Sequence, residues 1–336
     1  MKKSRLIAVL LGLALVAALT ACGSNGGGQG EGSAEKDAQT VVSEKFTVGV
    51  CQLVQHDALD AATEGFMDAI KEELGDSVEF DVQNGSGESA TCATICNGFA
   101  ASNVDLIMAN ATPALQAASA STGTIPILGT SVTEYGAALD IPDFTGVTGM
   151  NVSGTSDLAP LDQQAQMVKD LFPNAKTVGI LYCTSEVNSI YQKNVMMQEF
   201  EALGLTAKEY GFTDSNDVSL VTQTACDDCD VLFIPTDNVA ANNADAIDAV
   251  AREAKTPIIA GEEGLCKKCG VATLTIDYYE LGRVTGKMAV KVLLGEADVA
   301  SMPIEYDTNP VKKYNKELAD LYGVTIPDGY VEMGQE

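Results

Sequence analysis

Short apolar runs alternate with amphipathic stretches along most of the chain. The first amphipathic stretch has apolar residues at steps of three and four, from Leu59 through Phe66 to Leu74, and Gly75 follows as a stop signal. The apolar runs have the length of strands and lie at 48–50, 80–82, 105–108, 125–128, 178–182, 231–234, 257–260 and 271–276. Short apolar strands separated by helices predict parallel sheets that are covered by helices on both faces.

The second half of this pattern repeats the first. The sequence VGV at 48–50 returns as VGI at 178–180, and the strand that contains Pro126 returns at Pro257. Because the offsets are similar and the order is the same, the repeat predicts two lobes with one topology. The 291 residues from Phe46 to Glu336 are enough for two cores. We therefore expect an α/β fold of two doubly wound parallel-sheet lobes.

Polar segments follow the predicted strands in both lobes. In open α/β sheets, ligands bind at the carboxyl ends of the strands, where loops and helix N-termini converge. Any single Ser, Thr or Asn there is explained as well by helix capping, but six polar segments on one edge predict a binding cleft between the lobes. These segments lie at 55–57, 110–113, 130–133, 184–189, 235–238 and 261–263.

The chain begins with the features of an export signal. Three basic residues precede an apolar stretch at 6–19, and the sequence LTAC, which ends at Cys22, is followed by a Gly- and Ser-rich segment. The apolar stretch is short for a membrane span and fits a cleaved signal peptide of residues 1–21, with Cys22 as the lipidated mature N-terminus. An uncleaved anchor helix is the alternative. In both cases we expect the folded part to work outside the cytoplasm, anchored to the cell membrane.

Residues 22–45 have almost no apolar side chains before Val41, which predicts a flexible tether. The formal net charge of the chain is −27, and removal of the signal peptide leaves 17 basic against 47 acidic residues, a net charge of −30. An acidic surface repels phosphate backbones, so the charge argues against nucleic acid as a partner.

Five stretches of the sequence resemble one family. They are HDALDAATEGF (56–66), ATPALQAA (111–118), PTDN (235–238), AGEEG (260–264) and TLTIDYYELGRVTGKMA (273–289). Together they resemble the bacterial ABC-transporter substrate-binding lipoproteins that bind aromatic amino acids, a branch of the type I periplasmic-binding fold. The resemblance extends from Val48 to about Pro327. It is least complete at the cysteine pairs and at Glu262, where the family more often has Asp.

The resemblance implies two lobes that are joined by a hinge of three crossovers, near 151–157, 276–279 and 304–308. Lobe one would then comprise 46–151 and 277–305, and lobe two 152–276 and 306–336. It also implies a monomer without a cofactor that captures one small solute by closing its lobes and delivers it to a membrane permease driven by an ATPase. Tyrosine, tryptophan and phenylalanine are the expected solutes, with a branched-chain amino acid as an alternative.

A free amino acid needs an acidic partner for its ammonium group and hydrogen-bond donors for its carboxylate. We expect Asp237 and Glu262 to bind the ammonium group, and His56 and Tyr135 to contact an aromatic ring. The alternatives are a solvent-facing turn for His56 and ordinary packing for Tyr135. The expected ligand-binding residues are His56, Thr112, Pro113, Ser131, Thr133, Ser185, Glu186, Asn188, Ser189, Asp237, Asn238 and Glu262.

Eight cysteines remain besides Cys22, an even number suited to disulfides in an exported protein. The 36 residues between the two CxxC pairs are more than the roughly 15–20 of a zinc ribbon, so we expect structural disulfides there and no metal site. Cys51 and Cys183 end the first strand of each lobe and are expected to be free or separately paired. The disulfide candidates are Cys92 with Cys96, Cys226 with Cys229 and Cys266 with Cys269.

An enzyme is the main competing class. His56 is the single histidine, and the mature body has no GxSxG elbow, no P-loop and no full GxGxxG motif, so we expect no catalysis. A surface redox or zinc-holding lipoprotein that uses the CxxC pairs is a second alternative. A third, adhesion, would be compatible with solute binding.

Overall fold

The computed structural model describes residues 45–307 and 309–334. The predicted signal peptide, Cys22 and all but the last residue of the predicted tether lie outside these residues. Within the described ranges, no helix has both the length and the apolar character needed to cross a membrane.

The first sheet has six parallel strands in the order β11-β5-β4-β3-β1-β2. Its strands are β1 (Phe46–Gln52), β2 (Val78–Asn84), β3 (Leu106–Asn110), β4 (Ile127–Val132), β5 (Val152–Ser156) and β11 (Glu305–Tyr306). Its helices are α1 (Asp57–Leu74), α2 (Ser89–Ser102), α3 (Thr112–Ser121), α4 (Tyr135–Ala138) and α11 (Tyr278–Leu293), with a short 3-10 turn after α1 (Gly75–Ser77) and another after α11 (Val299–Ser301).

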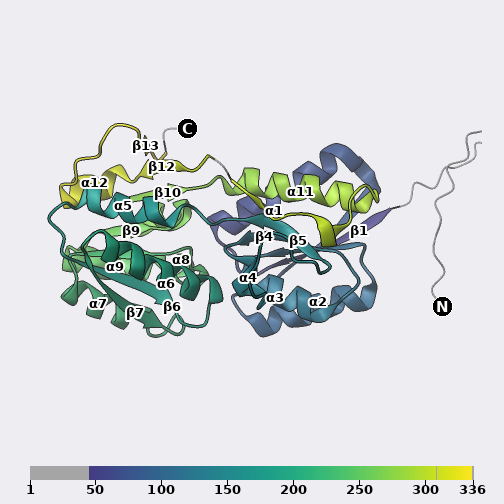
Figure 1. Ribbon diagram of the computed structural model, residues 1–336, viewed down its shortest axis with the longest axis horizontal. Helices are drawn as coiled ribbons and strands as arrows, with labels where there is room; N and C mark the ends of the chain where they lie inside the picture. Colours follow the sequence, from purple (N-terminus) through teal and green to yellow (C-terminus); the bar gives the residue numbers. More distant parts are fainter. Residues whose placement is uncertain (1–44, 308, 335–336) are drawn as a thin grey trace, which may run out of the picture. The chain divides into compact units, whose positions relative to one another are not determined.

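Helices cover both faces of this sheet. Phe66 of α1 and Met288 of α11 pack on one face against Val48 and Val50. On the opposite face, α2 and α3 supply a second apolar layer that includes Phe99. Figure 1 shows α11 beside α1, with α2 and α3 across the sheet.

The second sheet has seven strands in the order β13-β12-β10-β9-β8-β6-β7. Its strands are β6 (Thr177–Cys183), β7 (Thr206–Phe212), β8 (Val231–Ile234), β9 (Ile258–Ala260), β10 (Ala272–Thr275), β12 (Val311–Tyr314) and β13 (Val331–Glu332). All neighbours are parallel except β10 and β12. Its helices are α5 (Leu161–Leu171), α6 (Val187–Ala202), α7 (Val218–Asp228), α8 (Asn238–Asn242), α9 (Ala244–Ala254), α10 (Glu263–Cys269) and α12 (Lys316–Tyr322).

The two sheets wind in the same way. The order β2-β1-β3-β4-β5 in the first sheet corresponds to β7-β6-β8-β9-β10 in the second. This is the arrangement that the internal repeat of the sequence predicts. We call the body around the first sheet lobe one and the body around the second sheet lobe two.

The chain passes between the sheets three times, after β5, after β10 and between β11 and β12. The first sheet extends beyond the predicted boundary at 151, because β5 pairs with β4 and belongs to lobe one. Tyr306 also belongs to lobe one, because β11 pairs with β5. The predicted lobe bounds differ from the structure at these two points. The sequence VSGTS of β5 has too few apolar residues to be recognised as a strand.

Candidate functional site

The carboxyl ends of the strands in both lobes meet around one small cavity. Its volume is about 20 Å³, enough for about one water molecule, and it adjoins a second cavity of about 210 Å³ that shares His56, Ala241 and Glu262. The first cavity, called here the interlobe cavity, is lined by His56, Leu59, Ser131, Thr133, Asp157, Asn188, Thr236, Asp237, Asn238, Ala241, Glu262 and Tyr278.

Seven of the twelve predicted ligand-binding residues line this cavity, and five do not. Ser185 is exposed, and its hydroxyl contacts Cys183 Sγ at 3.0 Å and Thr213 O at 3.4 Å. Thr112 and Pro113 are buried at the start of α3. Glu186 and Ser189 lie behind the lining residues on the loop and first turn of α6. Ligand contact by the predicted set stays a prediction.

His56 connects the two lobes. It is the residue before α1, and its Nε2 lies 3.3 Å from Oδ1 of Asn238, the first residue of α8. Burial lowers the pKa of His56, which favours the neutral imidazole in this arrangement. The predicted ring contact of Tyr135 does not fit its position: the ring is 1 % exposed in the core of lobe one, where its hydroxyl donates to Thr155 O at 3.0 Å.

Asp157 lies on the first crossover and is a site residue that the sequence did not reveal. It is 5 % exposed, and its Oδ2 accepts a 3.0 Å hydrogen bond from the hydroxyl of Tyr278, which begins α11 after the second crossover. Burial raises the pKa of Asp157 to about 6, although hydrogen bonds from Tyr278 and Thr133 oppose the rise. The only sequence signal was a carboxylate directly after a polar strand.

Asp237 caps α8 in lobe two. Its Oδ1 accepts a hydrogen bond from the backbone N–H of Ala240 at 2.8 Å, and its Oδ2 accepts one from Cys183 N at 2.6 Å. Burial, followed by the charge of Glu186, raises the pKa of Asp237 to about 7. Asp237 therefore links the N-terminus of α8 to the carboxyl end of β6 through its two oxygens.

Glu262 caps the N-terminus of α10 in the same way. One carboxylate oxygen accepts a 2.6 Å hydrogen bond from Gly264 N, and the other accepts from Leu265 N. Burial raises the pKa of Glu262 to about 7. Each of these carboxylate oxygens can accept a second hydrogen bond beside its capping bond, so ammonium binding by Asp237 and Glu262 stays a prediction.

Glu186 organises the polar wall of lobe two. Its Oε2 accepts hydrogen bonds from Asn188 Nδ2 at 2.9 Å, from Asn238 N at 3.1 Å and from Asn238 Nδ2 at 2.9 Å. Asn188 Nδ2 also donates to Thr236 O at 3.0 Å, so both amide hydrogens are engaged and its Oδ1 is directed elsewhere. Glu186 thus acts as a positioning residue behind Asn188 and Asn238.

Four buried polar atoms on cavity-lining residues have no hydrogen-bond partner among the described residues. Buried polar groups in proteins are nearly always paired, so a cluster of this kind indicates that ordered water or a polar ligand pairs with these atoms. No Lys or Arg is among the described residues that line the interlobe cavity. The four atoms are Ser131 Oγ, Asp157 Oδ1, Asn188 Oδ1 and Thr236 Oγ1.

Ser131 is presented by an unusual backbone. Its φ is 53°, in the left-handed region that non-glycine residues rarely adopt, and the β4–β5 register shifts between Gly129 and Val132. Such strain persists where the surrounding structure holds it, often at ligand sites. Here it places a hydroxyl at the cavity.

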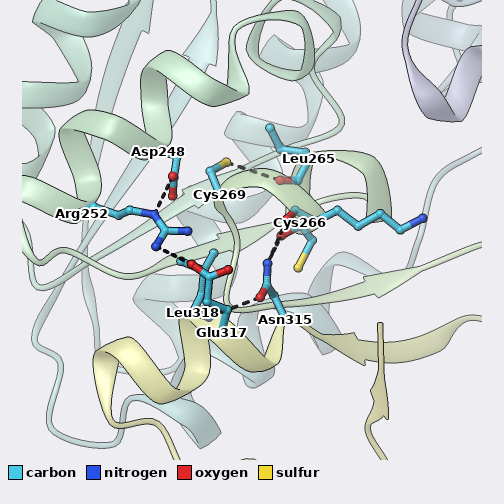
Figure 2. A network of polar contacts seen from close by, with 9 residues as sticks. Asp248, Arg252, Leu265, Cys266, Cys269, Asn315, Glu317 and Leu318 are labelled. Atoms are coloured by element: carbon cyan, nitrogen blue, oxygen red, sulfur yellow. Dashed lines mark hydrogen bonds and ion pairs between the residues drawn. The ribbon is translucent and has the colours of Figure 1, made fainter. Parts of the chain in front are cut away.

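The eight cysteines of the described residues are free thiols, so none of the three predicted pairs is bonded in this structure. Cys269 Sγ donates to Leu265 O at 3.4 Å and Cys266 Sγ donates to Gly270 O at 3.3 Å. Figure 2 shows this end of α10, which Asn315 ties to α12 by hydrogen bonds from its Nδ2 to backbone oxygens of α10. Among the described residues, no group of three or more His, Cys, Asp or Glu is arranged to hold a metal ion.

Residues 47–335 match the family model described as ABC transporter substrate binding protein. The chain belongs to this family. A "Tyrosine-binding protein" of Clostridioides difficile is 34% identical over 305 residues, which cover 90% of this chain and 87% of that protein. The members of the family bind solutes for ABC transporters and work outside the cytoplasm.

Solved structures extend the comparison within this family. An ABC domain from Streptococcus pneumonia in complex with L-Trp has a TM-score of 0.81 at 31% identity, covering 84% of this chain and 96% of that one. The ligand-free, open structure of a substrate binding protein with adhesive properties from Clostridium difficile has a TM-score of 0.66 at 36% identity, covering 85% and 99%. The predicted α/β fold of the type I periplasmic-binding class is confirmed.

The lobes contact each other at the cavity, where His56 Nε2 of lobe one lies 3.3 Å from Asn238 Oδ1 of lobe two. This substrate-binding protein superposes better on the L-Trp complex than on the open structure, although its sequence is closer to the latter. The difference agrees with the small interlobe cavity and with the contact between His56 and Asn238. The lobes are therefore in a closed arrangement.

Proposed function

We propose that this protein captures one free aromatic amino acid between its lobes and delivers it to the permease of an ABC importer. The observation that carries the proposal is the cluster of four polar atoms at the interlobe cavity that have no partner among the described residues, and that come from lobe one, lobe two and a crossover. An α-amino acid presents a donor group and an acceptor group within a few ångströms of each other. It can therefore pair with this cluster while bridging both lobes.

Asp157 and Asn188 are the proposed partners of the ammonium group. Asp157 Oδ1 and Asn188 Oδ1 are acceptors without a donor among the described residues, whereas both oxygens of Asp237 and of Glu262 already accept backbone hydrogen bonds. A charge-assisted bond to a buried carboxylate is also the strongest that this cavity offers to a cation. Asp157 is thus added to Asp237 and Glu262, the carboxylates first expected to bind the ammonium group.

Hydroxyl groups are the proposed partners of the ligand carboxylate. Ser131 Oγ and Thr236 Oγ1 are free to donate, and they come from lobe one and lobe two respectively. No Lys or Arg lines the cavity within the described ranges, so the carboxylate would be recognised by neutral donors. In this arrangement the carboxylate of Asp157 offsets the positive charge of the ammonium group, and the ligand carboxylate has only neutral partners among the described lining residues.

The side chain of the ligand would lie against Leu59, Ala241 and the imidazole of His56, toward the neighbouring cavity of about 210 Å³. An apolar wall next to an aromatic ring suits an aromatic side chain. Support comes from the relatives, because the curated one is named for tyrosine and a solved one contains L-Trp.

Capture requires the lobes to move, because the closed cavity has room for about one water molecule. The proposed hinge consists of the crossovers after β5, after β10 and between β11 and β12, and the proposed lobe bounds follow the two sheets. A shift from mostly open to mostly closed requires about 5.5 kcal/mol of differential binding. The charged pair with Asp157 and the buried ring together can supply this amount.

The proposed setting is the outer face of the cell membrane. Cys22 would carry the lipid, residues 22–45 would form the tether, and the permease with its ATPase would be the partner, with the binding protein acting as a monomer. The family supports the extracytoplasmic setting, and the N-terminal sequence pattern supports the anchor.

A thermal-shift screen of the twenty amino acids tests the proposal. Tyrosine, tryptophan or phenylalanine is expected to raise the melting temperature of the purified chain. Asp157→Asn is expected to remove the shift, and Asp162→Asn, the same change at an exposed position of α5, is expected to keep it. A shift with a branched-chain amino acid and none with the aromatic set would contradict the solute assignment.

A further inference from the structure

Three thiols of lobe one converge beneath the loop that carries His56. Cys51 is near the end of β1, and Cys92 and Cys96 are four residues apart on α2. All three are 0% exposed and belong to one apolar core. The neighbouring thiols of Cys92 and Cys96 raise the pKa of the Cys51 thiol well above its ordinary value.

The distribution of cysteines between the lobes limits how they can pair. Lobe one contains three of the eight cysteines and lobe two contains Cys183, Cys226, Cys229, Cys266 and Cys269. Each lobe therefore has an odd number. A bond between the lobes would oppose their movement, so at least one thiol in each lobe must stay free. The even total of eight cysteines suggested complete pairing. Because each lobe has an odd number, complete pairing within the lobes is impossible.

The predicted pair of Cys92 and Cys96 is disfavoured by helix geometry. Both residues lie in the uninterrupted helix α2. Residues four apart on a helix have Cβ atoms about 5–6 Å apart, whereas a disulfide needs about 3.5–4.5 Å. A bond between them would require α2 to unwind, and Cys51 on the neighbouring strand is the alternative partner.

We propose that Cys51 and Cys92 form a disulfide in lobe one, and that Cys96 remains the free thiol of this cluster. Cys92 is favoured over Cys96 because it is packed directly under the loop after β2: a Cβ at Gly85 would lie 2.4 Å from Cys92 Sγ, and Gly85 N donates to Gln52 O at 2.8 Å. The bond would tie the end of β1 to α2 at the base of the loop that ends in His56.

The reaction is a two-electron oxidation. The two thiols lose two protons and two electrons and form one S–S bond, while a disulfide oxidant outside the cytoplasm is reduced to two thiols. Because all three cysteines are buried in the folded lobe, the bond would form while the lobe folds. An extracytoplasmic compartment is where such bonds persist.

Peptide mapping of the full chain tests the assignment directly. The protein is unfolded and refolded with reduced and oxidised glutathione, its free thiols are alkylated, and it is digested after Glu. Peptide 45–64 contains Cys51 alone, and peptide 89–134 contains Cys92 and Cys96. The expected product links these two peptides and carries one alkylated thiol.

Three substitutions separate the possible partners. The link is expected to remain in Cys96→Ser and in Cys183→Ser, the matched control in lobe two, and to be absent from Cys92→Ser. Reduction of the linked protein is expected to lower its melting temperature by about 5–10 °C. A wild-type protein alkylated at all three cysteines, or a link that survives in Cys92→Ser, would overturn the proposal.

Discussion

The imidazole of His56 and the side-chain amide of Asn238 meet across the cleft, with Nε2 and Oδ1 3.3 Å apart. His56 precedes α1 in lobe one, and Asn238 begins α8 in lobe two. Glu186 Oε2 fixes the amide by accepting a 2.9 Å hydrogen bond from Asn238 Nδ2, so the Oδ1 atom faces the histidine. The contact therefore favours the closed arrangement specifically.

Loss of this contact should weaken ligand binding. A single hydrogen bond contributes about 1 kcal/mol, so His56→Ala is expected to raise Kd about five- to tenfold without a comparable loss of folding stability. Calorimetric titration measures the first quantity and chemical denaturation the second. His56→Gln, which can keep a donor, is the control and should lose less affinity. Equal affinity of wild type and His56→Ala would show that the contact does not stabilise the closed state.

Ligand binding should release protons near pH 6. The pKa of Asp157 is raised to about 6, so about half of the carboxyl groups are protonated at that pH. An ammonium group beside Oδ1 favours the charged form, and about half a proton per ligand is expected to leave. Titrations in buffers of different ionisation enthalpy measure this number. Release should vanish at pH 8; no release at pH 6 would remove Asp157 from the ammonium site.

Folding stability should fall as the pH rises from 5 to 7.5. Burial raises the pKa of Asp237 and of Glu262 to about 7, so the folded state holds more protons than the unfolded state over this range. Their contribution is complete below the ordinary carboxyl pKa and is lost as the pH rises through 7, by about 2 kcal/mol or more in total.

The substitutions Asp237→Asn and Glu262→Gln, made together, should flatten this dependence. Glu253→Gln, at an exposed position of α9, should leave it unchanged. Denaturant unfolding at a series of pH values gives the slopes. A double variant with the slope of the wild type would mean that these carboxyls do not hold their protons in the folded state.

Two glycines allow α1 and α11 to pack closely. A Cβ at Gly65 would lie 2.1 Å from Tyr279 O, and a Cβ at Gly282 would lie 2.1 Å from Ala62 O. Gly282→Ala should therefore lower the free energy of unfolding by about 1–3 kcal/mol. Gly98→Ala on α2, where nothing lies within 4 Å, should raise it by up to about 1 kcal/mol. If both substitutions shifted the denaturation midpoint in the same direction, the close approach would not be the cause.

Hydrophobic periodicity predicted the fold because its signals are local. The apolar strands at 178–182 and 231–234 correspond to β6 and β8, and the repeated motifs anticipated the common winding of the two sheets. β5 was missed as part of lobe one because its sequence VSGTS has a strand's position without a strand's apolar pattern. Its place in the sheet is set by pairing with β4, which no local signal contains.

The site was predicted only as a set of loops. The rule about strand ends located the segments around Asn188 and Asp237, and both residues line the cavity. The rule could not distinguish a carboxylate that caps a helix from one with an unpaired oxygen. That difference depends on the positions of neighbouring backbone N–H groups in the folded structure. Asp157 was missed for a related reason: its burial comes from the packing of two crossovers, including Tyr278 from far along the chain.

Calorimetric titration of the purified protein with L-tyrosine and with its deaminated analogue, 3-(4-hydroxyphenyl)propionate, tests the central claim most directly. The two compounds differ only in the ammonium group that Asp157 and Asn188 are proposed to bind. We expect L-tyrosine, or one of the other aromatic amino acids in a parallel pair, to bind at least about 100-fold more tightly than its analogue. Equal affinity for both members of each pair, or no binding of any aromatic amino acid, would contradict it.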